Sequence, residues 1–456
     1  MTQLATEKHA HMSNFSRLEN SSVAPAWLEA LRRAAIDRFD AVGFPSTKQE
    51  EWRFTNVAPI AKTEFRLAHH HDAQEAALTA SRFTFGHDAA SELVFINGRF
   101  EPQLSKLGKL PRGVRVTNLS DALETDSQVV EQHLGKYADI RGNPFVALNS
   151  GFIQEGALIH FSRDVALEQP IHLLFISTPA REPAVTHPRV LVVAEEGASA
   201  TLVESYVGSG RGVYFTNAVT EIVAGAGARV DHCKLQQENL DAYHVATMQV
   251  QLAARTQFVS HSATLGARLT RNDLTAVMGG EFADATLNGL VLISGEQHCD
   301  NHTVLDHARA NCPSHELYKH VLGGKSSGVF KGKILVRPNA QKTDSKQTSK
   351  SLLLTDDATM NAMPALEIYA DDVKCTHGST TGPVDEEQVF YLRQRGVGAE
   401  AARHLMTYAF AADITRRIKV EPVRRRLEEY MAAQHGLPLD LRINDLAAHD
   451  EAVQQI

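Results

Sequence analysis

The first part of the chain carries a helical pattern of apolar positions. From Pro25 onward, apolar residues recur at spacings of three and four with charged residues between them, namely Trp27, Leu28, Leu31, Ala34, Ala35 and Phe39. This spacing predicts an amphipathic helix. Further along, Asn97-Gly98 predicts a short hairpin turn, and the segment 126–137 is again helical in composition. We therefore expect residues 1–150 to form a mixed, mostly helical domain.

The pattern changes after Asn149. Short β-branched runs alternate with glycine-containing turns, and Gly197 and Gly227 each stand directly before an alternating strand. Similar turn-and-strand units follow at Arg255, Glu281 and Asn339. Weak repetition of this length predicts stacked β-coils, because each coil buries its inner face only against its neighbours. Residues 151–384 should form this core, with a β-sandwich as the alternative.

Helical signals return after Pro383. The acidic run Asp385-Glu386-Glu387 favours a helix N-terminus. In the next segment one helical face is expected to carry Ala401, Leu405, Tyr408 and Ala412. Residues 385–456 are thus predicted to form a C-terminal helical cap or docking domain.

Composition narrows the range of functions. The chain has 456 residues, 43% of them hydrophobic and 22% charged, with 46 Lys and Arg against 54 Asp and Glu. This is the composition of a folded globular protein, and its mildly acidic balance of -8 disfavours wholesale binding to nucleic acid or anionic membranes. Four scattered cysteines without a CxxC pair, and no signal-like or membrane-spanning run, favour the cytosol.

Two groups of residues could carry chemistry. Cys375 and His377 are two positions apart, so on a strand a thiol and an imidazole would lie on the same face. Such a pair can bind a soft metal, although two ligands need others from elsewhere, including another chain. Five histidines and two cysteines also lie between positions 298 and 320, but their spacing matches no compact zinc site, and strand-lining side chains are the favoured interpretation.

Five motifs resemble signatures of the SufB/SufD family, which belongs to the Suf iron-sulfur cluster assembly system. They are KQEEWRFTN at 48–56, SGVFKG at 327–332, QKTDSKQ at 341–347, DDVKCTHG at 371–378 and QVFYLRQRG at 388–396. The resemblance covers most of the chain from about residue 45 to 420. Leu392 stands where SufB proteins typically have cysteine, so the resemblance is to the SufD side of the family.

The resemblance implies a mainly β fold, with a right-handed parallel β-helix core flanked by N-terminal and C-terminal helical domains. It implies a scaffold without catalytic activity of its own, in a complex with SufB and the ATPase SufC that builds clusters for transfer to apoproteins. SufB would pair through the β-helix core and SufC through the C-terminal helices. A transient cluster or iron would be shared with SufB, and a reduced flavin stays possible only at the level of the complex.

By the same resemblance, His377 is the leading candidate at the SufB interface, with Cys375 beside it as a thiolate or a structural neighbour. The SufC docking surface would lie around residues 391–413, where Tyr391, Arg403, Leu405 and Tyr408 are candidates. Two alternatives stay open: an independent metal-binding β-helix enzyme, and a purely structural partner in which Cys375 and His377 only pack.

Overall fold

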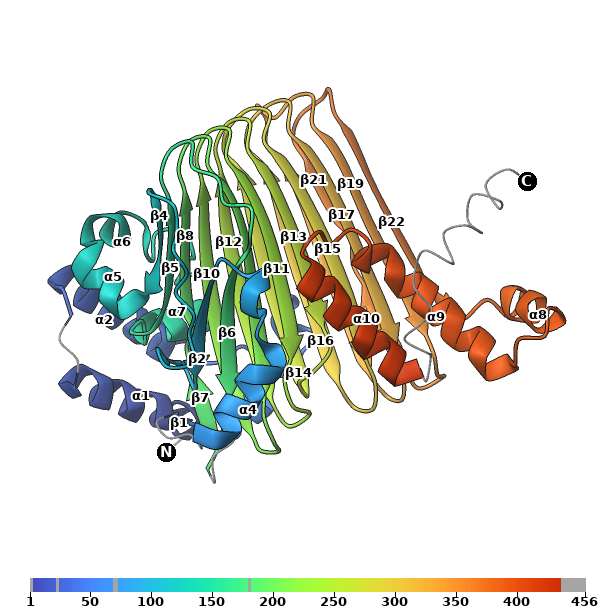
Figure 1. The fold of residues 1–456 in the computed structure, drawn as a ribbon, viewed down its shortest axis with the longest axis horizontal. Helices are drawn as coiled ribbons and strands as arrows, with labels where there is room; N and C mark the ends of the chain where they lie inside the picture. Colours follow the sequence, from blue (N-terminus) through green and yellow to red (C-terminus); the bar gives the residue numbers. More distant parts are fainter. Residues whose placement is uncertain (1–2, 22–23, 69–72, 179–181, 436–456) are drawn as a thin grey trace.

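The computed structural model describes residues 3–21, 24–68, 73–178 and 182–435. Its centre is a parallel β-solenoid, in which the chain alternates between two sheets as it advances along the axis, and helices lie along the flanks (Figure 1). The mainly β fold with a parallel β-helix core between helical segments is therefore confirmed. None of the described helices is long and apolar enough to cross a membrane.

Sheet A is one wall of the solenoid. Its main path consists of β4 (Val114–Asn118), β5 (Gly156–Phe161), β8 (Arg189–Ala194), β10 (Tyr214–Ala224), β12 (Tyr243–Leu252), β14 (Leu269–Met278), β16 (His298–His307), β18 (Ser327–Val336) and β20 (Thr359–Ala362). Three short strands pair beside this path, β1 (Arg66–Leu67), β7 (Ala184–Thr186) and β21 (Ala365–Ile368).

Sheet B is the opposite wall. It consists of β3 (Arg99–Phe100), β2 (Ser91–Ile96), β6 (Ile171–Ser177), β9 (Ser199–Gly208), β11 (Arg229–Gln237), β13 (Gln257–Thr264), β15 (Asp284–Ile293), β17 (Pro313–Leu322), β19 (Asp344–Leu353) and β22 (Lys374–Pro383). Neighbouring strands of the coils run parallel in register, which rules out the β-sandwich alternative, because a sandwich of this kind is built from antiparallel strands.

The same left-handed backbone conformation recurs at one turn of successive coils. Gly197 and Gly227 adopt a positive φ of 70°, and the N–H of each donates to a carbonyl of the next coil. The later coils place a side-chain-bearing residue in the same left-handed conformation, at Arg255, Phe282, Asn311 and Lys342. The repeat predicted from the glycine-strand units is thereby confirmed, because these units occupy equivalent positions of successive coils.

The hairpin predicted at Asn97-Gly98 is also confirmed. Both residues have positive φ, and they join β2 to β3 as an antiparallel pair. Through β2 and β3, and through β4, the first part of the chain supplies the initial strands of both sheets.

The N-terminal helices cover both walls at the start of the solenoid. Residues of α2 and α7 pack with aromatic and aliphatic side chains on the outer face of sheet A, whereas α4 covers the outer face of sheet B. The helices are α1 (Gln3–Ser21), α2 (Ala26–Val42), α3 (Ala58–Lys62), α4 (Ala73–Phe83), α5 (Leu119–Thr125), α6 (Ser127–His133) and α7 (Pro144–Gly151), with two 3₁₀ turns, η1 (Glu50–Trp52) and η2 (Gly86–Asp88).

The C-terminal helices follow the last strand. Asp385 caps α8 (Glu386–Gln394) by accepting from the N–H of Glu387 at 2.9 Å, as its acidic sequence predicted. α9 (Ala399–Thr415) and α10 (Glu421–His435) lie against the outer face of sheet B, and α8 projects away from the solenoid (Figure 1). The remainder of the predicted C-terminal domain, residues 436–456, lies outside the described residues.

Candidate functional site

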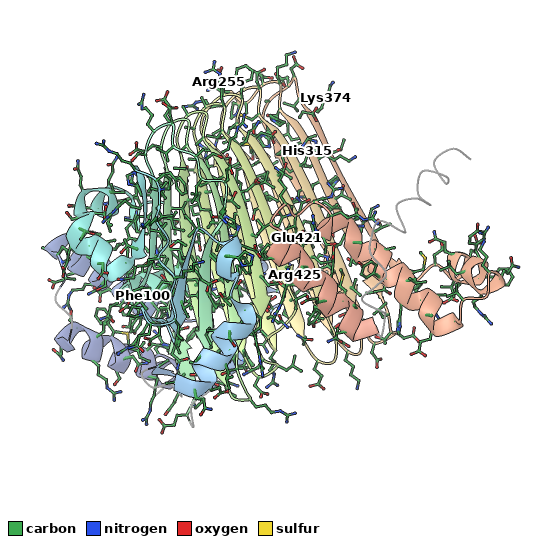
Figure 2. All side chains as sticks on the ribbon, viewed as in Figure 1. Phe100, Arg255, His315, Lys374, Glu421 and Arg425 are labelled. Atoms are coloured by element: carbon green, nitrogen blue, oxygen red, sulfur yellow. The ribbon has the colours of Figure 1, made fainter. Side chains whose placement is uncertain are left out.

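The solenoid ends at β22, the last strand of sheet B. Its residues pair one to one with β19 on one side, and no strand among the described residues pairs with its other side. Lys374, at the start of β22, lies at this edge, and His315 lies two strands away on β17 (Figure 2). An open edge strand presents unpaired backbone donors and acceptors to which another chain can bind.

Cys375 and His377 lie on β22, as a strand-borne pair requires. Their register partners on β19 are Ser345 and Gln347, which are buried inside the solenoid. Cys375 and His377 therefore continue two interior rows to the open end. Four of the residues of β22 that continue interior rows are called the end face here; they are Cys375, His377, Ser379 and Thr381.

The two candidate ligands differ in exposure. His377 is exposed, whereas Cys375 is half-buried and packs beside the cluster that contains Ile334 and Val336. Burial, reinforced by the nearby carboxylate of Asp344, raises the pKa of the Cys375 thiol. In the free chain this cysteine is a neutral thiol at pH 7, and metal binding would first require loss of its proton.

The proposed docking residues on the C-terminal helices have distinct environments. Tyr391 on α8 is exposed and carries the guanidinium of Arg395 over its ring at 4.3 Å. Arg403 on α9 pairs with Glu386 of α8 at 2.8 Å, which links the two helices. Leu405 is half-buried, and Tyr408 is buried in the cluster that joins α9 and α10 to sheet B.

The histidine-rich stretch does not gather into one site. His298 and His302 lie on the outer face of sheet A, His315 is exposed on sheet B, and His307 and His320 are buried. Both cysteines, Cys299 and Cys312, are buried as well. Within the described ranges, no group of three or more histidine, cysteine or acidic side chains is arranged to hold a metal ion.

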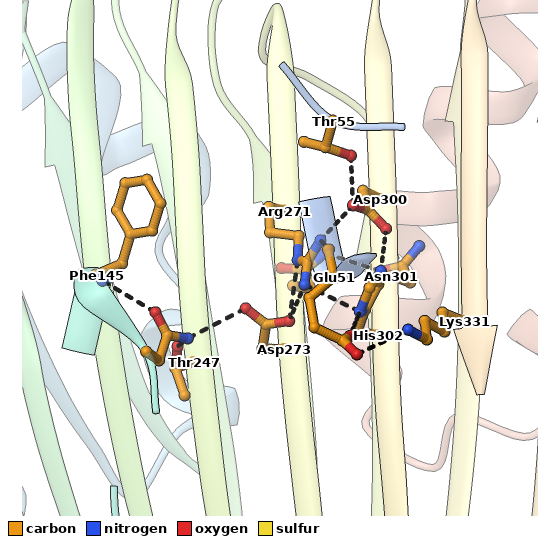
Figure 3. Close-up of polar contacts among 12 residues, drawn as sticks. Glu51, Thr55, Phe145, Thr247, Arg271, Asp273, Asp300, Asn301, His302 and Lys331 are labelled. Atoms are coloured by element: carbon orange, nitrogen blue, oxygen red, sulfur yellow. Dashed lines mark hydrogen bonds and ion pairs between the residues drawn. The ribbon is translucent and has the colours of Figure 1, made fainter. Parts of the chain in front are cut away.

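A second polar cluster lies where the segment 48–56 docks on the outer face of sheet A (Figure 3). Trp52 is buried beneath the guanidinium of Arg271, which lies 4.2 Å from the ring centroid. Arg271 also donates to the carbonyl oxygen of Glu51 at 2.9 Å and pairs with Asp300 at 2.6 Å. Thr55 donates to the same Asp300 carboxylate. Residues far apart in sequence are thus fixed together by one buried arginine.

The electrostatics of this cluster favour ion pairing. Burial alone would disfavour the charged forms of Asp300 and His302, but their mutual attraction, with Arg271 beside Asp300, lowers the pKa of Asp300 and raises that of His302. The pKa of Glu51 is lowered to about 2 by its hydrogen bond with His302 and by Lys331, whose Nζ lies 2.8 Å from Oε1 of Glu51. All three groups therefore hold the docked segment most firmly when they are charged.

Acid should release this segment, and Glu51→Gln should remove part of that sensitivity. Because the folded pKa of Glu51 is depressed from 4.5 to about 2, its contribution to stability is present above pH 4.5 and is lost as the pH falls towards 2. Trp52 fluorescence, recorded in a Trp27→Phe background, reports the docking. At neutral pH we expect Glu51→Gln to lower the free energy of unfolding by at most about 1 kcal/mol, because the Glu51 side chain is mostly exposed. Glu50→Gln is the control, and equal acid titrations for the two variants would contradict the assignment.

These features define a parallel β-solenoid protein in which sheet B ends in an open strand and helices pack on the flanks. Its residues 175–410 match the model of the SufBD core domain of the SUF system for FeS cluster assembly, and residues 10–173 match that of the SufBD N-terminal region. The chain therefore belongs to the SufBD family of iron-sulfur cluster assembly proteins.

Similar curated proteins agree with this assignment. An iron-sulfur cluster assembly SufBD family protein of Synechocystis is 31% identical over 412 residues, which cover 88% of this chain and 90% of the relative. SufD of Escherichia coli is 30% identical over 388 residues, covering 84% and 88% of the two chains. SufD of Bacillus subtilis is 24% identical over 437 residues, covering 93% and 97%.

Sequence reasoning missed how the family motifs meet in space. The segment 48–56 contacts His302 and Lys331, and Gly332 of the motif 327–332 faces Gln347 of the motif 341–347 inside the solenoid. The motifs themselves were the available signal. Their mutual positions follow from which strands are stacked, and that information is not present in the spacing of residues along the chain.

Proposed function

We propose that this chain is the SufD-type scaffold subunit of a complex with SufB and SufC, which assembles iron-sulfur clusters for transfer to apoproteins. In this role the cluster is cargo, the chain performs no turnover by itself, and ATP hydrolysis belongs to SufC. We place this activity in the cytoplasm. The observation that carries the proposal is the open edge of β22, which presents His377 at the end of the solenoid.

The end face supports a partner that binds edge to edge. A strand of SufB added to the free side of β22 would satisfy its backbone groups and bring new side chains beside His377. A partner is also what the chemistry requires, because an exposed imidazole and a neutral, half-buried thiol are too few ligands to hold iron alone. We assign His377 as the direct ligand for iron or a nascent cluster, and Cys375 as a second ligand beside it.

The C-terminal helices support a separate docking site for SufC. Phe390 and Tyr391 are both more than half exposed on the projecting helix α8. Aromatic side chains of this kind commonly anchor protein interfaces. We propose that Tyr391 and Leu405 contact SufC, that Arg403 holds α8 in position through Glu386, and that Tyr408 keeps α9 on the solenoid. The two partners would then occupy different parts of this chain.

Native mass after anaerobic co-expression with SufB and SufC tests the complex itself. We expect one assembly that survives salt sufficient to remove weak surface association. Recovery of the folded chain alone, with both partners soluble, would contradict the scaffold and favour the independent metal-binding enzyme.

His377→Ala should lower the iron and acid-labile sulfide recovered with the complex by at least about tenfold. Loss of a residue that only hydrogen-bonds to a metal ligand already lowers metal affinity by about this factor, and loss of the ligand itself should lower it at least as much. Iron and sulfide content per complex is the measurement, and native mass should stay unchanged. His315→Ala is the matched control, since that histidine is also exposed on sheet B. Normal cluster content in an intact His377→Ala complex would leave this chain a purely structural partner.

A further inference from the structure

The interior of the solenoid is polar at its end, as it also is in the middle coils around Glu204, His232 and Lys234. Along one inward-facing row of sheet B, Leu287 of β15 is followed by Glu316, Gln347 and then His377 on the next three strands. Other inward-facing positions show the same change, with Val291, His320, Ser351 and Thr381 in sequence. At these two positions, therefore, apolar side chains on β15 are followed by polar side chains on the later strands.

A specific contact lies in this polar end. Gln347 donates from Nε2 to Oε2 of Glu316 at 2.6 Å, and both side chains are buried. Across the interior, sheet A has a glycine, Gly332, where a Cβ atom would lie 2.1 Å from Nε2 of Gln347. Gly332 thus makes the space into which the amide extends, and any larger residue would displace it.

Several buried polar atoms around this contact have no hydrogen-bond partner among the described residues. They are Oε1 of Glu316, Oε1 of Gln347, both ring nitrogens of His320, and the hydroxyl oxygens of Ser349 and Ser351. A buried polar group that is left without a partner destabilises the folded state. Native proteins satisfy groups of this kind with ordered water.

We propose that the last coils enclose a hydrated polar slot, in which ordered water binds Glu316, His320, Gln347, Ser349 and Ser351, and through which Glu316 exchanges its proton with solvent at the end face. In the exchange, the O–H bond of the carboxyl breaks, its proton passes to a bound water, and the carboxylate stays in the slot. Only the layer of β22 separates Gln347 from the open end.

The charges that face the slot agree with an acid that can lose its proton. Burial raises the pKa of Glu316 to about 7, against the opposing effect of hydrogen bonding with Thr303 and with Gln347. Burial also raises the pKa of Tyr318 and Cys299 and lowers that of His320 to about 4, so all three are neutral near pH 7. In the same row, His232 lies three strands before Glu316, and His377 lies two strands after it, at the end face.

The slot does not depend on the proposed scaffold function, because it is a property of the free chain. Its position has a consequence only if that function holds: the slot would then move protons to or from the face where clusters are assembled.

A high-resolution crystal structure of the full chain tests the water directly. We expect ordered water within hydrogen-bonding distance of Oε1 of Glu316 and of the ring of His320. A structure in which these atoms pair with one another and no water occupies the space would overturn the proposal.

Infrared difference spectra of the free chain test the proton. A carboxylic acid band should disappear as the pH rises from about 5 to about 9, should shift promptly in deuterated water, and should be missing in Glu316→Gln. The control Glu296→Gln, on an exposed turn, should keep the band. A band that is insensitive to pH, or that does not exchange, would contradict proton exchange through the slot.

The pH dependence of stability gives an independent readout in case the spectra are crowded. Because the folded pKa of Glu316 is raised from 4.5 to about 7, the wild type should lose stability as the pH rises through this window. The Glu316→Gln variant should not show this loss, so its denaturation midpoint should move above that of the wild type between about pH 5 and about pH 8. An unchanged difference between the two proteins would count against a titrating Glu316, and Glu316→Asp should retain the wild-type trend.

Discussion

Arg189→Met should lower the free energy of unfolding by about 3–5 kcal/mol, because it leaves a buried carboxylate without its counter-charge. Arg189 and Glu221 are both fully buried, and Nη2 of the arginine lies 2.5 Å from Oε2 of the glutamate. Glu221 also accepts backbone N–H groups from the loop that precedes α7, at Gly135, Tyr137 and Ala138. Losing the arginine therefore destabilises both the solenoid and its attachment to the N-terminal helices.

Chemical denaturation followed by circular dichroism measures this effect. The matched control is Arg163→Met, whose arginine pairs with Glu196 at 2.9 Å on the surface, with both side chains more than half exposed. That change should cost no more than about 1 kcal/mol, since exposed ion pairs contribute little. Equal losses in the two variants would show that the buried pair does not hold the loop and the sheet together.

Gly280→Ala should destabilise the protein by about 3 kcal/mol, because the new methyl group has no space between two stacked coils. A Cβ atom at Gly280 would lie 2.1 Å from the backbone N of Ala254 and 2.5 Å from the carbonyl carbon of Ala253. These are backbone atoms of the preceding coil, so relief requires the two coils to move apart. Thermal unfolding of the purified chain is the measurement.

Gly378→Ala is the control for this prediction. Gly378 lies on β22, and an added Cβ there meets no atom within 4 Å. We expect its melting temperature to stay near that of the wild type. If Gly280→Ala also melted at the temperature of the wild type, that result would contradict the close stacking of the coils at this turn.

Much of the fold could be predicted from local pattern. The apolar spacing after Pro25 identified α2, and Leu28, Ala35 and Phe39 are buried as expected. Arg32 is one of the charged residues that lie between these apolar positions, yet it is buried, and its Nε donates to the carbonyl oxygen of Ile153 at 2.7 Å. A helical pattern predicts on which face of the helix a residue lies. It does not predict that a neighbouring segment will supply a hydrogen-bond acceptor for a buried polar side chain.

The face of α9 shows the same limit. The sequence pattern places Ala401 on one face with Tyr408 and Ala412, yet Ala401 is exposed, and Ala402 is buried together with Tyr408 and Ala412. The contact surface on this helix is wider than the predicted stripe. Lys319 of β17 explains part of the difference, because it reaches across to the carbonyl oxygen of Phe410 at 2.9 Å and fixes the rotation of the helix.

The site was only partly predictable for a related reason. Residues two positions apart on a strand lie on the same face. The placement of Cys375 and His377 on one face of β22 could therefore be predicted from the sequence. The row that joins His377 to Gln347 and Glu316 did not, because it depends on the register between coils whose lengths vary. Register is decided by the packing of whole coils, and a single sequence does not specify it.

The left-handed turn residues occupy the same position relative to the following strand in successive coils. Gly227 and Arg255 are closer in sequence than Asn311 and Lys342, yet all four occupy equivalent turns. The extra residues of the longer coil precede the left-handed position in the turn, because four residues, 253–256, join β12 to β13 whereas seven, 337–343, join β18 to β19. A short insertion on the N-terminal side of Arg255 should therefore be tolerated, whereas the same insertion between Arg255 and β13 should shift every strand that follows.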